Sequence, residues 1–421
     1  MVILLGFGPG DGGSTPLGTI LFNYLLFLTI LMKNLLIIGI NTRSLVNSAL
    51  KLDYNVFTTT YFKTSDFPDI KNCKSLLNEK ENQSCGSFED LYSAENILKE
   101  SAEYLELADY IVLQSGVSPS DFKGKYSKYK KKILGNTATE NIEDKFRFYK
   151  KIRNEFKTPE TFNINDVNEA IEIADSYPEK QFILKPLSGS GGYNINLLDN
   201  DSLNELKDIE KPCLLQEYIE GMNLSSSTLG TGEKSKHLIN SRLLTARDFG
   251  DKNSFMYIGN ILPLTKKLHP DGDSLNSEMK ETSERLIKKF KLKGSNGIDF
   301  IASEKGLYVI ELNPRIQGTY ECCENVLNVN MLYAHIEACN GNLIDIPPIN
   351  GYSYKKIIYA NETNKFKGLP LENIYDLPHI GSITEKGEPL LTIIDKNENL
   401  DKLIENIELL TKKVVDLEKS H

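Results

Sequence analysis

Residues 311–315, which read ELNPR, decide the fold when they are taken together with Asp299 before them. Two short apolar runs, 297–301 and 307–312, stand on either side of a turn and predict a hairpin of two strands. Because the two strands of a hairpin face each other, we expect Asp299 and the start of ELNPR to lie at one place.

Three side chains of this predicted hairpin carry oxygen ligands. Glu311 and Asn313 are two residues apart, so they point to the same face of one strand. Mg²⁺ prefers hard oxygen ligands and commonly shares them with substrate phosphates, which makes Asp299, Glu311 and Asn313 candidate metal ligands. Arg315 follows with a guanidinium fork that can bind oxygen atoms of a transferring phosphoryl group.

Two lysines and a glycine-rich run precede the hairpin. Lys145 lies in a basic, helical stretch, and Lys185 is followed by SGSGG at residues 188–192. A lysine ends in a point charge on a flexible stem, which suits a phosphate oxygen. Glycine lacks the Cβ that would keep backbone N–H groups away from phosphate. Taken alone, the run could be a simple turn and Lys145 a solvated helix charge.

Residues 216–221 read QEYIEG and predict a strand that runs into a turn. The strand edge can offer main-chain N–H and C=O groups to the rim of an adenine. If a nucleotide binds here, an acidic side chain close behind could take the ribose hydroxyls. A turn that simply ends the strand is the alternative.

Four features occur in a fixed order along the chain: Lys145, Lys185 with the glycine-rich run, QEYIEG, and Asp299 with ELNPR. In this order and spacing, they resemble the ATP-grasp superfamily. The sequence is most similar to uncharacterised archaeal members described as predicted ATP-dependent carboligases, and the resemblance covers nearly all of residues 32–421. It implies an α/β ATP-grasp fold with a Rossmann-like N-terminal (pre-ATP-grasp) domain and a small C-terminal α+β domain. In this family ATP phosphorylates a carboxylate, and a nucleophile, usually an amine, attacks the acyl phosphate.

The resemblance also implies roles for particular residues. Lys145 and Lys185 would hold the phosphates of ATP, and Lys185 and Arg315 would be catalytic, with Arg315 stabilising the charged transition state. Two Mg²⁺ ions, or Mn²⁺ in their place, would be held by Asp299, Glu311 and Asn313. The flexible loop over the phosphates would consist of Ser188, Gly189, Ser190, Gly191 and Gly192. The adenine hinge would be Glu217, Tyr218 and Ile219, with Glu220 on the ribose.

Apolar and helical stretches alternate in the first third of the chain. Buried-strand patterns at 35–40, 55–61 and 110–113, separated by helical stretches, predict a βαβ, doubly wound domain over 32–136. The resemblance places an ATP-grasp domain at 137–345, with a lid subdomain at about 150–215, and a C-terminal domain at 346–421. Helices are expected at 141–156, 166–176, 278–290 and the C-terminal end, and a polar loop at 66–87.

Composition excludes several classes of protein. The 421 residues contain 49 Lys+Arg and 58 Asp+Glu, and the net charge of −9 disfavours a nucleic-acid binder. Six cysteines without a C-x-x-C pair exclude a disulfide scaffold and fit reduced thiols in a cytoplasm. Cys322 and Cys323 are expected to pack as small apolar groups.

The N-terminal 31 residues have two interpretations. Residues 17–32 are apolar but shorter than the roughly 20 residues that span a membrane, and no Lys or Arg precedes them, as a signal peptide would require. The sequence MKNLLIIGINTRS from Met32 looks like an ordinary protein start. The preceding segment is therefore either an extension from an upstream start codon or an anchor or interfacial segment. Without such an anchor, we expect no membrane association and a cytoplasmic protein.

The roles of some polar residues outside these motifs stay open. Gly39-x-Asn41-x-Arg43 after the first strand could bind substrate at a switch point of the sheet or be an ordinary strand-to-helix turn. Arg242, Arg247 and Lys266 lie where this superfamily often contacts its acid substrate, but their spacing is not diagnostic.

Three functions follow from these features. The first is an ATP- and Mg²⁺-dependent carboxylate–amine, or carboxylate–thiol, ligase in small-metabolite or coenzyme biosynthesis, with tyramine–glutamate ligation as one candidate. The second is a carboxylase that uses bicarbonate, although no biotin-attachment sequence AMKM occurs. The third is an ATP-binding regulatory or membrane-tethered protein without turnover. The expected partners are ATP, a small carboxylic acid and an amine. The oligomeric state stays open, and a homo-oligomer is possible.

Overall fold

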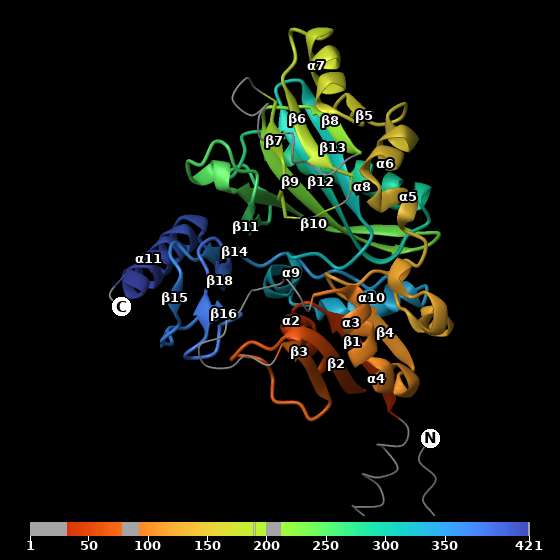
Figure 1. The fold of residues 1–421 in the computed structure, drawn as a ribbon, viewed down its shortest axis with the longest axis vertical. Helices are drawn as coiled ribbons and strands as arrows, with labels where there is room; N and C mark the ends of the chain where they lie inside the picture. Colours follow the sequence, from red (N-terminus) through yellow and green to blue (C-terminus); the bar gives the residue numbers. More distant parts are fainter. Residues whose placement is uncertain (1–31, 78–91, 188, 190, 199–211, 420–421) are drawn as a thin grey trace, which may run out of the picture.

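The computed structural model describes residues 32–77, 92–187, 189, 191–198 and 212–419. Figure 1 shows three layers: a lid at the top, a large central sheet, and an N-terminal unit at the bottom. The N-terminal segment 1–31, for which the sequence left two interpretations open, lies outside the described residues.

The N-terminal unit is a parallel sheet of four strands in the order β3-β2-β1-β4. The apolar run of β1 is buried on both faces, as its sequence predicted. Helices α2, α3 and α4 join the strands and pack against them. The bounds are β1 Lys33–Gly39, α2 Arg43–Ala49, β2 Tyr54–Phe62, β3 Cys73–Leu77, α3 Ala94–Glu100, α4 Ala102–Leu107 and β4 Tyr110–Leu113.

Strand β3 was not predicted, because its residues fall within the expected polar loop at 66–87. It is short, lies at the edge of the sheet beside β2, and is only half-buried along its whole length. A strand in this position shows neither a continuous apolar run nor a clear alternation, so the pattern did not reveal it.

The predicted helix over 141–156 is interrupted. It consists of α5 (Glu140–Glu143) and α6 (Lys145–Ile152). Asp144 between them has an extended backbone, and its carboxylate accepts a hydrogen bond of 2.9 Å from the N–H of Arg147. An aspartate in this role caps a new helix, so it ends one helix and begins the next.

The lid is an antiparallel sheet of four strands with the order β5-β8-β6-β7. Helix α7 covers it, and both share a small core around Phe182 and Leu215. The bounds are β5 Thr161–Ile164, α7 Val167–Asp175, β6 Phe182–Pro186, β7 Asn196–Leu197 and β8 Cys213–Glu217.

The central sheet has eight antiparallel strands in the order β13-β12-β9-β10-β11-β14-β18-β16. The predicted hairpin at 297–312 forms one end of it. Strand β14 pairs with β11, so the C-terminal segment continues the same sheet. The bounds are β9 Met222–Thr231, β10 Ser235–Thr245, β11 Tyr257–Leu262, β12 Lys293–Ser303, β13 Gly306–Asn313, β14 Tyr352–Tyr359, β16 Ile374–Tyr375 and β18 Pro389–Asn397, with a separate pair β15 Asn364–Lys365 and β17 Ile383–Thr384.

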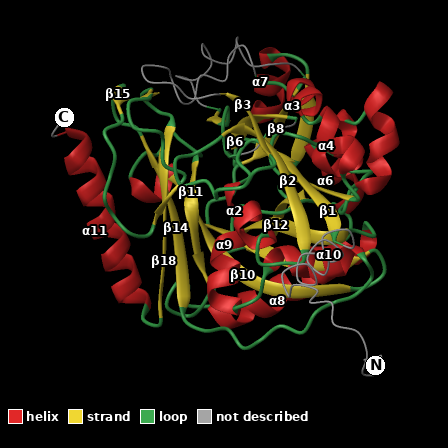
Figure 2. Ribbon diagram, turned by 90° about the horizontal axis from the view of Figure 1, so that it is seen from below, coloured by secondary structure: helices red, strands yellow, loops and turns green. Residues whose placement is uncertain are grey.

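Helices cover the central sheet on both sides. Helix α8 packs on β9 and β10, α10 packs on β12, and the amphipathic α11 lies along β14 and β18 at the edge of the molecule (Figure 2). Cys322 and Cys323 are buried in α9, and burial raises the pKa of both thiols, as expected for small packed groups. The bounds are α8 Gly272–Lys289, α9 Tyr320–Leu327, α10 Met331–Cys339 and α11 Leu400–Lys419, and the short 3₁₀ turns are Pro119–Asp121, Gly124–Lys132 and Ala246–Phe249.

A buried ion cluster joins the N-terminal unit to the rest of the chain. The side chain of Arg43 is 2% exposed and lies 2.7 Å from Asp376, 2.9 Å from Glu321 and 3.4 Å from Asp66. Asn41 also donates to Asp376, at 2.8 Å. Burial opposes the charge of Arg43, but the three carboxylates outweigh it and raise the pKa of the guanidinium above its usual value. The N-terminal unit, α9 and the C-terminal segment therefore meet at one cation.

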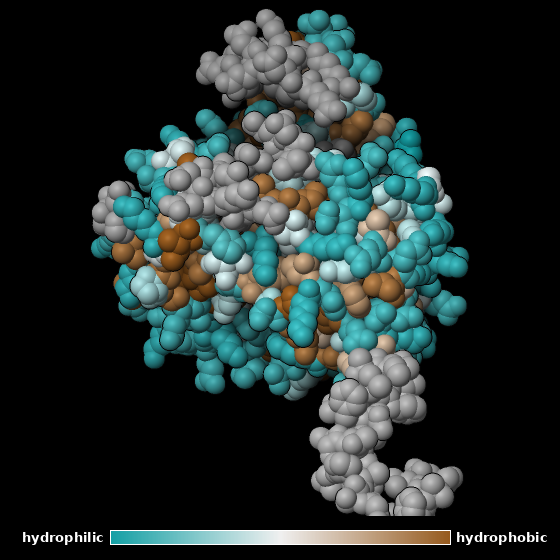
Figure 3. All heavy atoms as spheres, turned by 60° about the horizontal axis from the view of Figure 1, so that its bottom comes forward, coloured by the Kyte–Doolittle hydropathy of each residue, from teal (hydrophilic) through white to brown (hydrophobic). Residues whose placement is uncertain are grey.

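Within the described part of the chain, no helix is both long and apolar enough to cross a membrane. On the face that Figure 3 shows, hydrophilic side chains cover most of the described surface, and hydrophobic side chains are exposed in small groups.

Candidate active site

The predicted hairpin brings the three candidate metal ligands together. In the pairing of β12 with β13, Asp299 stands opposite Glu311. The amide nitrogen of Asn313 donates to Asp299 Oδ2 at 3.1 Å. A bulge in the pairing follows Asp299, so the strand bends at this point.

The electrostatics of this group fit a divalent cation. Burial and then the carboxylate of Glu311 raise the pKa of Asp299 to about 6, although Ser225, Arg315 and Lys145 act in the opposite direction. Ser225 Oγ donates to Asp299 Oδ1 at 2.7 Å and fixes that carboxylate. Two half-buried carboxylates that repel each other form the oxygen set that Mg²⁺ or Mn²⁺ favours.

Lys145 links the hairpin to the lid. It is the first residue of α6, and its Nζ lies 3.2 Å from Glu311 Oε2. The same Nζ donates to the carbonyl oxygen of Gly189 at 3.0 Å. One ammonium group therefore contacts both Glu311 among the metal-ligand candidates and the glycine-rich run.

Lys185 lies deeper in the lid, on β6. Its side chain is 3% exposed, and its Nζ donates to Gln216 Oε1 at 2.7 Å. Gln216 is held in turn because its amide donates to Thr161 Oγ1 at 2.8 Å. Burial and then the positive charge of Lys145 lower the pKa of Lys185 to about 7, with Glu311 acting in the opposite direction.

The glycine-rich run docks on the segment before β11. Ser188 and Ser190 lie outside the described residues. The N–H of Tyr257 donates to the carbonyl of Gly191 at 2.9 Å. Gly192 has φ +76°, and a Cβ on it would stand 2.0 Å from the carbonyl oxygen of Phe255. This docking therefore requires glycine at 192.

The substitution Gly192→Ala should undock this run. The clash involves a backbone atom, which cannot rotate away, and alanine is strained at positive φ. We expect the hydrogen-exchange protection of the Tyr257 amide to fall by at least about tenfold, because its acceptor on Gly191 moves away. Gly250→Ala is the matched control, since Gly250 also has positive φ (+99°) but nothing lies within 4 Å of its Cβ position. Equal protection in both variants would contradict the docking argument.

The predicted adenine hinge follows β8 and has specific contacts. Glu217 accepts the N–H of Glu160 at 3.1 Å and lies 3.4 Å from Lys180 Nζ. The N–H of Tyr218 donates to the carbonyl of Gln181 at 2.7 Å, so it is not free for an adenine. Ile219 is buried and Glu220 is exposed, as a ribose ligand would need to be.

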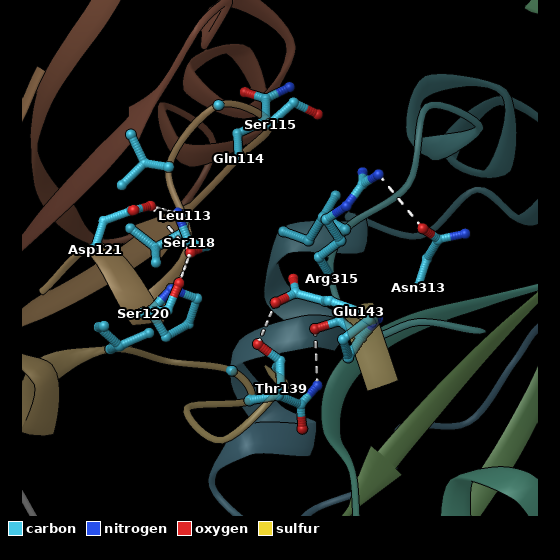
Figure 4. A pocket seen from close by; sticks show the side chains of 18 of the residues that line it. Leu113, Gln114, Ser115, Ser118, Ser120, Asp121, Thr139, Glu143, Asn313 and Arg315 are labelled. Carbon is cyan, nitrogen blue, oxygen red and sulfur yellow. Dashed lines mark hydrogen bonds between the residues drawn. The ribbon is translucent and has the colours of Figure 1, made fainter. Parts of the chain in front are cut away.

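A cleft of about 400 Å³ opens beside the hairpin. One wall is the loop 113–121 after β4, and the opposite wall is 311–316 with Lys145. In Figure 4, Gln114, Ser118 and Asp121 lie across the cleft from Asn313 and Arg315. Arg315 Nη2 is 3.4 Å from Asn313 Oδ1, which places the guanidinium next to the candidate metal ligands.

The sequence analysis did not single out the loop 113–121 or the connecting residues 133–143. Thr139 and Glu143 line the cleft and are joined by a hydrogen bond of 2.6 Å. Asn136 donates to the carbonyl of Pro314 at 2.9 Å and so fixes the connection against ELNPR. One signal in the sequence could have revealed this loop. Ser115-Gly116 follows a predicted parallel strand, and ligands bind at the ends of such strands in open α/β sheets.

Other basic residues of the sequence analysis lie away from this cleft. Asn41 and Arg43 belong to the buried ion cluster, which favours a structural role for that turn. Arg242 pairs with Asp248 at 2.9 Å, and Lys266 pairs with Asp273 at 2.8 Å on the surface. Arg247 lies over the rings of Tyr218 and Phe255 beside the hinge.

Comparison with known proteins identifies the family. The ATP-grasp domain family matches residues 142–319. An uncharacterised protein of Methanocaldococcus jannaschii is 30% identical over 379 residues, which are 88% of this chain and 90% of that protein. The chain therefore belongs to the ATP-grasp family, as its motifs predicted.

Other relatives extend this comparison. Tyramine–L-glutamate ligase from the same archaeon is 28% identical over 286 residues, which cover 65% of this chain and 72% of the ligase. The solved N5-carboxyaminoimidazole synthase of Aspergillus clavatus, in complex with ADP and 5-aminoimidazole ribonucleotide, has a TM-score of 0.68 at 15% identity, over 91% of this chain and 99% of that one. The biotin carboxylase domain of Hydrogenobacter thermophilus 2-oxoglutarate carboxylase has a TM-score of 0.65 at 18% identity, with 88% of each chain covered. These likenesses confirm the predicted fold class.

Proposed function

We propose that the protein is an ATP- and Mg²⁺-dependent ligase that activates a carboxylate as an acyl phosphate for attack by an amine. One observation carries the proposal. Lys145, Glu311, Asn313 and Arg315 line one wall of a cleft that is large enough for small substrates, and Asp299 accepts a hydrogen bond from Asn313 behind this wall. The reaction releases ADP and phosphate.

Each group at this wall has a task in that reaction. Lys145 and Lys185 bind the phosphates of ATP, and Asp299, Glu311 and Asn313 hold the divalent cation. The cation, when bound, neutralises charge on the phosphates. Arg315, at the edge of the cleft, binds the oxygens of the transferring phosphoryl group and then those of the acyl phosphate.

The bonds balance without a protein nucleophile. A carboxylate oxygen of the acid substrate attacks the γ-phosphorus of ATP, and the bond from that phosphorus to the β-phosphate oxygen breaks, so ADP leaves. The amine nitrogen then attacks the acyl carbon, the bond from that carbon to the phosphate oxygen breaks, and the nitrogen loses a proton. Such chemistry needs mainly positioning and charge stabilisation.

The remaining assignments concern the nucleotide base and the lid. We place the adenine at Glu217–Ile219, with Glu220 on the ribose and the run 188–192 over the phosphates. Because Tyr218 N–H already donates to Gln181, a main-chain donor for adenine has to come from elsewhere in the hinge. The exposed carboxylate of Glu220 is available for ribose hydroxyls.

The relatives support an amine as the nucleophile. Tyramine–L-glutamate ligase, by its name, joins an amine to an amino acid, and the alignment covers 72% of its length. We therefore favour a carboxylate–amine ligase in small-metabolite or coenzyme biosynthesis over a carboxylase that uses bicarbonate.

Binding of ATP should be coupled to uptake of a proton by Lys185. In the free protein its pKa of about 7 leaves the amine mostly neutral at pH 8. A phosphate beside it favours the charged form, so binding takes up close to one proton at pH 8 and few at pH 6. Above pH 7 the affinity for ATP should therefore fall by up to about tenfold per pH unit.

Isothermal titration of ATP in two buffers with different ionisation enthalpies measures this uptake. The variant Lys185→Met should bind ATP more weakly and show no buffer dependence at pH 8. A wild-type protein that binds ATP at pH 8 without taking up a proton would contradict the assignment of Lys185.

The function is tested by a screen for ADP release. The full chain is incubated with ATP, Mg²⁺ and pairs of candidate acids and amines, and we expect ADP only where both partners are present. Substrate-dependent incorporation of labelled bicarbonate would instead favour a carboxylase. Binding of ATP without phosphate release across the whole screen would reject the ligase and favour a regulatory protein.

A further inference from the structure

One wall of the cleft has no task in the machinery proposed above. We call it the acceptor wall, and it consists of the loop 113–121. Thr139 and Glu143 line the same cleft from the connection that Asn136 fixes against ELNPR. The loop reads LQSGVSPSD and contains neither Lys nor Arg. The basic side chains among the described lining residues, Lys145 and Arg315, belong to the hairpin side. His335 also lines the cleft, but burial lowers its pKa to about 4, so it adds no positive charge at neutral pH.

The acceptor wall and Glu143 present hydrogen-bond acceptors to the cleft that protein donors only partly use. Asp121 Oδ2 accepts from the N–H and the hydroxyl of Ser118, and Oδ1 has no partner within the described residues. Glu143 Oε2 accepts from Thr139 at 2.6 Å, and Oε1 is likewise without a partner there. These bonds hold each carboxylate in place while one oxygen stays available.

Gln114 adds an observation of a different kind. Its side-chain oxygen is buried, lies in the same wall and finds no hydrogen-bond donor in the described part of the chain. A buried acceptor without a donor is costly, and such atoms are normally satisfied by a ligand or by water. The wall is therefore complementary to a ligand that is rich in donors.

We propose that the acceptor wall binds the nucleophile, and that this nucleophile is a small primary amine, protonated in solution and without a phosphate group. The proposal rests on the ligase function stated above. An ammonium group has three donors and a positive charge, which suit the free oxygens that Asp121, Glu143 and Gln114 present to the cleft. Before the attack it gives one proton to solvent or to one of the two carboxylates, and the neutral nitrogen then reacts and loses its second proton. The volume of about 400 Å³ limits the amine to the size of a small metabolite.

The same charges exclude other nucleophiles. A phosphorylated amine such as 5-aminoimidazole ribonucleotide, or a phosphate-bearing thiol such as coenzyme A, would bring negative charge to two carboxylates. No Lys or Arg stands on the acceptor wall to offset that repulsion. Like charges brought together in a cleft reject a ligand, so the wall acts as a filter for the charge of the nucleophile.

The first part of the test compares classes of nucleophile with the full chain. ADP release with ATP, Mg²⁺ and a panel of small acids is measured with small primary amines, including tyramine, and with 5-aminoimidazole ribonucleotide and coenzyme A. We expect stimulation by one or more cationic amines and none by the phosphate-bearing probes. For tyramine, 4-ethylphenol is the matched probe without the amine, and it should fail. Stimulation by a phosphate-bearing probe alone overturns the proposal and leaves the ligase function standing.

The second part neutralises the two carboxylates. Glu143→Gln and Asp121→Asn keep the side-chain acceptors for Thr139 and Ser118 but remove one charge each. We expect the KM for the active amine to rise at least about tenfold in each variant, while the KM for ATP stays within about twofold. Glu140→Gln is the control, because Glu140 is exposed on the same short helix and does not line the cleft.

Two outcomes separate the inference from the function on which it rests. If the amine KM is unchanged in both neutralised variants, or if no cationic amine stimulates ADP release while another nucleophile does, the inference fails and the ligase stands. If no acid and nucleophile pair of any class yields ADP, the ligase function fails and this inference fails with it.

Discussion

Replacing Glu311 by glutamine is expected to lower kcat/KM for ADP release by at least about 100-fold, because a metal site contributes several kcal/mol of charge stabilisation to phosphoryl transfer. The carboxylate faces Asp299 across the hairpin and is 3.2 Å from Lys145. Glutamine has nearly the same shape but no charge, so the proposed cation site would lose one of its two carboxylates. The binding of Mn²⁺ in the presence of ADP, followed by electron paramagnetic resonance, should weaken in parallel.

The fold of the Glu311→Gln variant should survive. The substitution removes both the repulsion on Asp299 and the ion pair with Lys145, while Lys145 keeps its hydrogen bond to Gly189, so the thermal unfolding midpoint should change little. Glu304→Gln, in the exposed turn of the same hairpin, is the control and should keep full activity. Turnover of Glu311→Gln equal to that of the wild type would reject the metal assignment.

Replacing Arg43 by methionine should lower the free energy of unfolding by about 3–5 kcal/mol, the usual cost of removing one partner from a buried ion pair. Asp376, Glu321 and Asp66 would then repel one another without a cation. At present the charge and hydrogen bond of Arg43 outweigh the effect of burial and hold the pKa of Asp376 at about 2. The variant should therefore be least stable at neutral pH and recover part of its stability as acid protonates the cluster.

Chemical or thermal unfolding across a pH series measures this effect. Arg147→Met is the control, since Arg147 is 61% exposed and its pair with Asp144 should be worth less than about 1 kcal/mol. Arg43→Met with Asp376→Asn should be less destabilised than Arg43→Met alone, because one carboxylate less is left without a partner. An Arg43→Met protein as stable as the control would show that the cluster does not hold the three segments together.

Local pattern was enough for much of the fold. The hairpin at 297–312, the strand 110–113 and the C-terminal helix follow from periodicity within a few residues of chain. The same holds for Asp299, Glu311 and Asn313, whose proximity needs only a turn between two strands. Resemblance to a family added the proposed roles of Lys145 and Lys185 as phosphate ligands, which no local rule assigns.

The rest depends on contacts between distant parts of the chain. Arg43 stands in an ordinary strand-to-helix turn, and its partners Glu321 and Asp376 are 278 and 333 positions away. Glu143 looks like one more charge on a surface helix until the loop 113–121 is placed opposite to it. The interruption at Asp144 was visible in principle, because aspartate favours the cap of a helix over its interior.

The pairing of β14 with β11 bears on how the protein can be divided for experiments. A version shortened after residue 345 would keep every proposed substrate contact, yet it would lack the strand that hydrogen-bonds to β11 along Gly259–Leu262. The bare N–H and C=O groups of such an edge recruit strands from other molecules, so the fragment is expected to aggregate. The C-terminal segment therefore covers the edge of β11, and any version of the protein made for experiments should retain it.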